Sequence, residues 1–179
     1  NFPIKSGETA YLFLQHFIKK LKSGGRAGII IKDTFLSNLD AKLLRKELLE
    51  TCNLHTILNL PRKVFTAGVK TIVLFFEKGV STKKIFYYDL NLNRNLGLTN
   101  PLTKSDLTDF ENLYSNKKDS LNSWFKNISD INKETWDLKV NNPNQIEKID
   151  TRTPKEIVDE IEEIELKTKK SLNKIKNLL

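Results

Sequence analysis

Two short apolar runs on either side of one helical segment constrain the fold of this chain more than any other feature. The runs are residues 26–31 (RAGIII) and 54–60 (LHTILNL). Such runs are typical of strands covered on both faces in a parallel sheet. The segment between them predicts a helix with Asp40 as its N-cap and Leu43 among its inward leucines. Because a strand–helix–strand crossover is almost always right-handed and gives parallel neighbours, this order predicts an α/β fold.

Further elements extend this unit on both sides. Residues 7–22 predict an amphipathic helix with Phe13 and Phe17 on its apolar side. Residues 71–77 and 84–90 predict two more apolar strands, and the short joint between them predicts that they are antiparallel. The set is typical of the C-terminal part of a doubly wound Rossmann-like sheet with an antiparallel last strand.

The composition changes after residue 90 and divides the chain. Residues 91–122 are rich in Asn, Asp, Ser and Lys, and the Asn-Pro turn near residue 142 marks a second boundary. We therefore predict three parts: the end of a sheet domain in residues 1–90, a loop-rich cover in residues 91–150, and a C-terminal helix in residues 151–179.

The C-terminal helix has the clearest start signal in the sequence. Thr153 as N-cap, Pro154 at the first helical position and Glu156 three residues after the cap form a capping box. One narrow face of the helix is apolar, and such a face requires either a partner helix or the chain's own domain to cover it. The members of this apolar stripe, which Thr168 interrupts, are Ile157, Ile161, Ile164, Leu172, Ile175 and Leu179.

Charge and composition narrow the possible partners. The net charge is +8, and residues 1–78 carry 13 Lys or Arg against 6 Asp or Glu. This local excess predicts a surface that faces a polyanion, although a merely solvated basic surface is the alternative.

Cys52 is the single cysteine, and with two histidines it cannot complete a zinc site of four protein ligands. No apolar stretch is long enough to span a membrane, and we expect a reducing, cytoplasmic setting.

Common catalytic and nucleotide-binding motifs are absent from the sequence. It contains no G-x-x-x-x-G-K-[ST], G-x-G-x-x-G, G-x-S-x-G or H-E-x-x-H, and no nucleophile, base and orienting group follow a known spacing. Gly24-Gly25 ends a helix and opens a strand, the reverse of the order that binds phosphate. We therefore assign no catalytic residue and no metal ligand within this chain.

An ordered set of short strings closely resembles the modification (M) subunit of type I restriction-modification systems. The resemblance covers nearly the whole chain and rests on Leu14-Gln15-His16, Ser23-Gly24-Gly25-Arg26-Ala27, Leu58-Asn59-Leu60-Pro61, Val64-Phe65, Gly68-Val69-Lys70-Thr71, Val73-Leu74-Phe75-Phe76, Tyr87-Tyr88-Asp89-Leu90 and Trp136-Asp137-Leu138. It implies an S-adenosylmethionine-dependent methyltransferase sheet and methyl transfer to N6 of adenine in DNA. The implied partners are double-stranded DNA, the specificity (S) subunit and the restriction (R) subunit.

The chain lacks the motifs that carry cofactor binding and catalysis in this family. The family's glycine-rich cofactor loop and its N-P-P-F motif are absent, and Lys32 stands where the family usually has proline. There is no Met at position 1 or elsewhere. We expect the chain to be the C-terminal part of such a subunit, which neither binds S-adenosylmethionine strongly nor methylates by itself.

The resemblance also implies roles for residues near the third predicted strand. In this family the target adenine is flipped out of the duplex into a pocket. Phe65 is then a base-contacting residue, and Arg62, Lys63 and Lys70 contact backbone phosphates. The alternative is that Val64 and Phe65 plug the end of the sheet and the three cations are solvated. The stripe of the C-terminal helix, from Ile157 to Leu179, would dock on the S subunit.

Two other functions fit the same sequence. The first is a non-catalytic module that binds DNA or a partner through its basic sheet and its helix. The second is a solitary adenine DNA methyltransferase without an S partner, in which the C-terminal helix has no docking role.

Overall fold

The computed structural model describes residues 2–65, 68–145 and 152–177. The chain divides into two compact units, Asn1–Gln145 and Ile146–Leu179, and each is described by itself. The division of the first unit at residue 90 stays a prediction.

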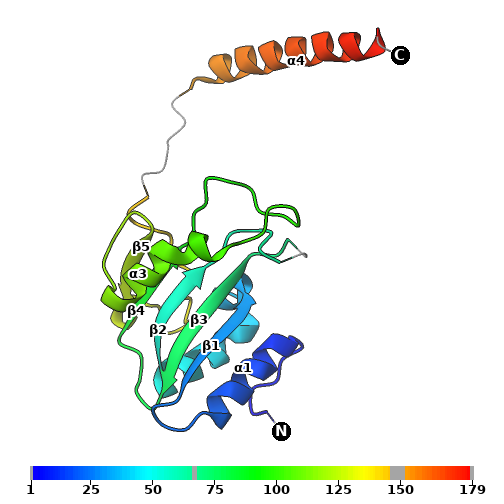
Figure 1. Ribbon diagram of the computed structural model, residues 1–179. Helices are drawn as coiled ribbons and strands as arrows, with labels where there is room; N and C mark the ends of the chain where they lie inside the picture. The colour runs from blue at the N-terminus through cyan, green and yellow to red at the C-terminus, as the bar shows by residue number, and fades with distance from the viewer. Residues whose placement is uncertain (1, 66–67, 146–151, 178–179) are drawn as a thin grey trace. The chain divides into compact units, whose positions relative to one another are not determined.

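The first unit combines helices with one five-stranded sheet (Figure 1). Its helices are α1 (Thr9–Lys20), α2 (Lys42–Thr51) and α3 (Thr108–Asn116), and its strands are β1 (Arg26–Lys32), β2 (Cys52–Asn59), β3 (Thr71–Lys78), β4 (Lys84–Asp89) and β5 (Ser123–Asn127). Short 3-10 turns lie at Asp33–Leu36, Leu39–Ala41, Lys104–Leu107 and Ile128–Asp130. The predicted α/β class and the four predicted strands are confirmed.

The order of the strands in the sheet is β1-β3-β2-β4-β5. Strand β3 is antiparallel to both β1 and β2, β2 is parallel to β4, and β5 is antiparallel to β4. Strands β1 and β2 therefore run in the same direction, as predicted, but they are not neighbours. The prediction that β1 and β2 are neighbours was wrong, because β3 lies between them. Strand β3 runs antiparallel to β4, as predicted, but the two strands do not pair, because β2 lies between them.

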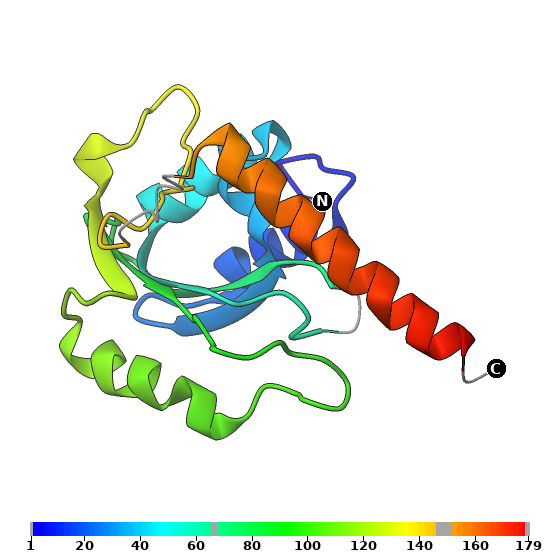
Figure 2. The ribbon, with the colours of Figure 1, turned by 90° about the horizontal axis from the view of Figure 1, so that it is seen from above.

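Helices cover both faces of the sheet. One core cluster joins α1 and α2 to the sheet, with Leu14 and Leu44 fully buried, and a second cluster packs Phe110 of α3 on the other face. Figure 2 shows α3, in green, on the opposite side of the sheet from the blue and cyan helices α1 and α2. A register shift between Leu54 and Thr56 is a β-bulge. It explains how Leu54 and Ile57, three residues apart, both reach the α1–α2 face.

Three local expectations about burial and capping were wrong. Strand β1 is an edge strand, and only Ile31 of it is buried while Ile30 is 52% exposed. Phe13 and Leu43 are also exposed, because neighbouring residues of α1 and α2 occupy the sheet-facing positions. Phe17, the other aromatic residue placed on the apolar side of α1, is 39% exposed.

The start of α2 also differs from the prediction. A 3-10 turn at Leu39–Ala41 precedes the helix, and the side chain of Asn38, rather than that of Asp40, caps it. The Oδ1 atom of Asn38 accepts a hydrogen bond of 3.0 Å from the backbone N–H of Asp40. Asp40 is therefore inside the turn instead of before it.

Arg45 on α2 is fully buried and ties two distant segments together. Its guanidinium donates to the carbonyl oxygens of Phe35 and Asn38, at 2.7 Å each. It also donates to those of Trp136 at 2.6 Å and Thr135 at 2.9 Å. Residues 135–136, which lie 90 positions further along the chain, are thereby fixed against α2.

The second unit consists of α4 (Pro154–Lys176) and its flanks. The predicted capping box is confirmed, since Thr153 N–H donates to Glu156 Oε2 at 2.6 Å and Glu156 N–H donates to Thr153 Oγ1 at 3.3 Å. No residue of α4 is buried. The stripe residues Ile161 and Ile164 are 58% and 55% exposed, and Leu179 lies outside the described residues.

Within the described ranges, no helix has the length and apolar character needed to cross a membrane.

Candidate functional site

The carboxyl ends of β1, β2 and β4 meet at one edge of the sheet. Hydrogen bonds link their following segments: Asp33 N–H donates to Lys70 O at 3.1 Å, and Leu90 N–H donates to Asn59 O at 2.9 Å. The side chain of Asn59 also donates to Asp89 Oδ1 at 2.7 Å. In open α/β sheets, ligands bind outside the carboxyl ends of the strands. We therefore expect a ligand-binding site at the carboxyl ends of β1, β2 and β4.

A hollow of about 570 Å³ opens at this edge. It brings together all three cations predicted to contact phosphate, Arg62, Lys63 and Lys70. Arg94, which the sequence analysis missed, also lines the hollow. The one carboxylate in its lining is that of Asp89.

The three predicted cations have charge available for a ligand. All three are exposed, and none of them forms an ion pair with another described residue. Lys63 has a φ of 65°, a left-handed backbone conformation that is uncommon for residues with a Cβ. Arg94 differs from them, since its guanidinium is paired with Asp106. The hollow thus offers three unpaired positive charges against one carboxylate.

Phe65 lies beside this hollow rather than in its lining. It borders two neighbouring hollows, one of about 510 Å³ shared with Lys63 and Leu98, and an apolar one of about 490 Å³ over β2 and β3. Val64 packs against the core cluster on the α3 face, whereas Phe65 remains 42% exposed. Val64 therefore belongs to the packing of this face, while part of the ring of Phe65 is accessible from outside.

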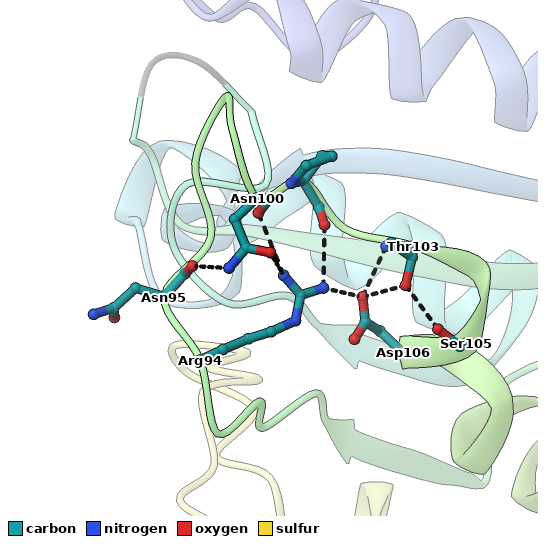
Figure 3. Close-up of polar contacts among 7 residues, drawn as sticks. Arg94, Asn95, Asn100, Thr103, Ser105 and Asp106 are labelled. Atoms are coloured by element: carbon teal, nitrogen blue, oxygen red, sulfur yellow. Dashed lines mark hydrogen bonds and ion pairs between the residues drawn. The ribbon is translucent and has the colours of Figure 1, made fainter.

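A polar network orders the loop that follows β4, between Arg94 and Asp106 (Figure 3). Arg94 donates to the carbonyl oxygen of Pro101 at 3.1 Å and to the side-chain oxygens of Asn100 and Asp106 at 2.5 Å each. Backbone and side-chain hydrogen bonds from Thr103, and then Arg94, hold the pKa of Asp106 below its usual range. The sequence carried one signal for this network, the Thr103-x-x-Asp106 capping pattern.

The Gly24-Gly25 turn does not form a cradle for a nucleotide cofactor, because it lies at the amino end of β1. Gly24-Gly25 connects α1 to β1, as predicted, and a Cβ at Gly25 would meet Lys22 O at 2.8 Å. Gly25 thus serves close packing within the chain, and Gly24 supplies the left-handed backbone conformation of the turn, with a φ of 77°. Among the described residues there is also no group of three His, Cys, Asp or Glu side chains that could hold a metal ion.

The fold places the protein in the class of α/β proteins with a Rossmann-like sheet. A chain from a structure of complex assembly and conformational transition in a type I restriction-modification system superposes on 99% of this chain. Its TM-score is 0.73, its identity is 31%, and the match covers 41% of that chain.

The chain belongs to the N-6 DNA methylase family, whose model matches residues 2–152. It is 32% identical over its full length to the methylase subunit of the type I restriction enzyme EcoEI from Escherichia coli, of which it spans 39%. It is 40% identical over 114 residues to the StySJI methylase subunit from Salmonella typhimurium, matching 57% of this chain and 22% of that relative. The resemblance seen in the sequence is thus confirmed for the family, and the chain spans about two fifths of the first relative's length.

Proposed function

We propose that this chain is the C-terminal part of the M subunit of a type I restriction-modification system. The complete subunit would transfer a methyl group from S-adenosylmethionine to N6 of adenine in DNA, with the S and R subunits as partners. The observation that carries this proposal is the set of unpaired cations at the carboxyl edge of a methylase-family sheet. A surface of this kind neutralises phosphates and releases their counterions, which favours DNA binding.

Two kinds of contact to DNA are proposed, one from charged side chains to phosphates and one from an apolar ring to a base. Arg62, Lys63 and Lys70 would contact the phosphate backbone and fix the register of the duplex. The accessible ring of Phe65, between the cations and an apolar hollow, would stack on the displaced adenine. The cofactor would be held by residues of the complete subunit outside this chain, because the family's glycine-rich cofactor loop is absent from its sequence.

The function is tested with the complete subunit co-expressed with its S subunit. Tritium-labelled S-adenosylmethionine and bacterial genomic DNA are supplied, and the labelled nucleoside is identified after digestion. Label in N6-methyladenine supports the proposal. An assembly that binds DNA without transferring label would instead identify a non-catalytic binding module.

Phe65→Ala in the complete subunit is expected to reduce the rate of methyl transfer by about 10- to 100-fold, because base–aromatic stacking contributes roughly 1–3 kcal/mol. Binding of S-adenosylmethionine, measured by calorimetry, should stay unchanged. Val69→Ala is the control, since Val69 is 37% exposed in the same loop. Unchanged turnover of the Phe65 variant would refute the assignment.

Ile164→Asp is expected to weaken capture of the S subunit at least tenfold, because it places a charge in the centre of the apolar stripe on α4. Leu166→Asp is the matched control. Leu166 is 57% exposed, close to the 55% of Ile164, and lies two positions away on the opposite face of the helix. Co-purification on a tagged S subunit measures both variants, and equal losses would contradict docking through the stripe.

A further inference from the structure

Leu98 is the most exposed large apolar residue in the described chain, at 86% exposure. It sits at the tip of a tight turn in which Gly97 and Asn100 exchange two backbone hydrogen bonds of 3.1 Å. Leu96, two positions earlier, is buried and anchors the same loop. The turn thus holds one leucine inside the protein and presents the next one to solvent.

The base of this loop is braced rather than loose. The Nδ2 atom of Asn100 donates to Asn95 O at 2.8 Å, and the Arg94 guanidinium joins Asn100 and Pro101 to Asp106 (Figure 3). The ends of the loop are therefore tied to each other and to the start of the turn that leads into α3. A loop ordered before binding loses little conformational entropy when it meets a partner.

The surroundings of Leu98 identify the chemistry of that partner. Leu98 lines the same hollow as Lys63 and Phe65, and the adjoining hollow is lined by Arg62 and Lys70. Arg94 contributes no free charge there, because it is spent on the brace. An exposed apolar side chain such as Leu98, flanked by unpaired cations, is complementary to a polyanion that has apolar groups in its interior. A DNA duplex has this combination, since phosphates surround its stacked bases.

We infer that residues 95–101 form a DNA wedge, in which Leu98 inserts between base steps beside the cationic hollow and Arg94 is the positioning residue that holds the loop in place. Apolar side chains used in this way partly unstack the duplex. The inference rests on the proposed function and deepens it, by adding a contact that charge does not supply.

The test uses the complete subunit assembled with its S subunit and a fluorescein-labelled duplex that carries the site methylated by the wild-type enzyme. Leu98→Ala is expected to raise the Kd about tenfold at every salt concentration from 0.05 to 0.3 M. The slope of log K against log salt stays unchanged, because an apolar contact releases no counterions. Val80→Ala, in the turn between β3 and β4 with Val80 59% exposed, is the control and leaves the Kd unchanged.

Arg94→Lys tests the brace, because lysine keeps the charge and loses the planar fork that reaches Asn100, Pro101 and Asp106 together. Its effect on the Kd should match that of Leu98→Ala, and the double variant should be no weaker than either single variant. Additive effects would show that Arg94 does not act through Leu98.

Two outcomes overturn the wedge. One is a Leu98→Ala variant with the Kd of the wild type, and the other is a Leu98→Ala variant that weakens binding no more than the Val80→Ala control. The proposed function fails separately, when the wild-type assembly transfers no methyl group to DNA.

Discussion

Arg45→Met is expected to lower the free energy of unfolding by roughly 3 to 5 kcal/mol. Methionine fills a similar volume but donates no hydrogen bond. The carbonyl oxygens of Phe35, Thr135 and Trp136 would lose their bonds to the guanidinium, while Asn38 O keeps a second bond from Ala41 N–H. A buried acceptor without a donor costs its full desolvation.

The buried charge of Arg45 also makes the protein depend on its hydrogen bonds to carbonyl oxygens. Burial lowers the pKa of its guanidinium and the nearby Asp137 opposes this, yet arginine remains charged in proteins. Among the described residues it forms no ion pair, so carbonyl dipoles compensate its charge. The side chain is therefore fixed by geometry that no other residue type reproduces.

Denaturant unfolding followed by tryptophan fluorescence measures this loss, because both tryptophans, Trp124 and Trp136, are buried. Lys46→Met, at the next and half-exposed position of α2, is the control and should change stability by less than about 0.5 kcal/mol. A loss below about 1 kcal/mol for Arg45→Met would mean that water replaces the guanidinium at low cost.

The triple variant Arg62→Gln, Lys63→Gly, Lys70→Gln is expected to weaken DNA binding by the complete assembly roughly 100-fold at 0.15 M salt. Three lost phosphate contacts reduce the slope of log K against log salt by about 2.7. Glycine is chosen at position 63 because the φ of 65° suits it, so the loop keeps its path while the charge is removed. This change of slope separates the cations from the apolar Leu98, which leaves the slope unaltered.

A second triple variant controls for net charge. Lys22→Gln, Arg26→Gln and Lys83→Gln remove the same charge from exposed residues near the amino ends of β1 and β4, at the opposite edge of the sheet. Fluorescence anisotropy titrations at several salt concentrations compare the two. Equal weakening by both triples would mean that the total charge of the chain, not the hollow, attracts DNA.

Much of the local structure could be predicted from the sequence. The capping box at Thr153 and the apolar strands depend on residues close together in the chain, and both are confirmed. The loop cations could be predicted as a group because they flank the ends of two strands. The family resemblance also depended on short ordered strings, and the match over residues 2–152 confirms it.

The errors share one physical origin. The burial of β1 was overestimated because an apolar run does not show how many neighbours a strand has, and β1 has one. The brace from Arg94 to Asp106 escaped notice because a charged residue in a polar loop is usually solvated. Its role appears only when the loop closes on itself.

The sequence by itself determined four of the strands, the helices α1, α2 and α4, the start of α4 and the family, because periodicity, capping and motif order act between near neighbours. Only the tertiary structure decided that β3 separates β1 from β2 and that Arg45 reaches residues 135–136. It also decided that Leu98 emerges beside the loop cations. These features depend on hydrogen bonds and packing between segments far apart in the chain, and local residue patterns do not encode such pairings.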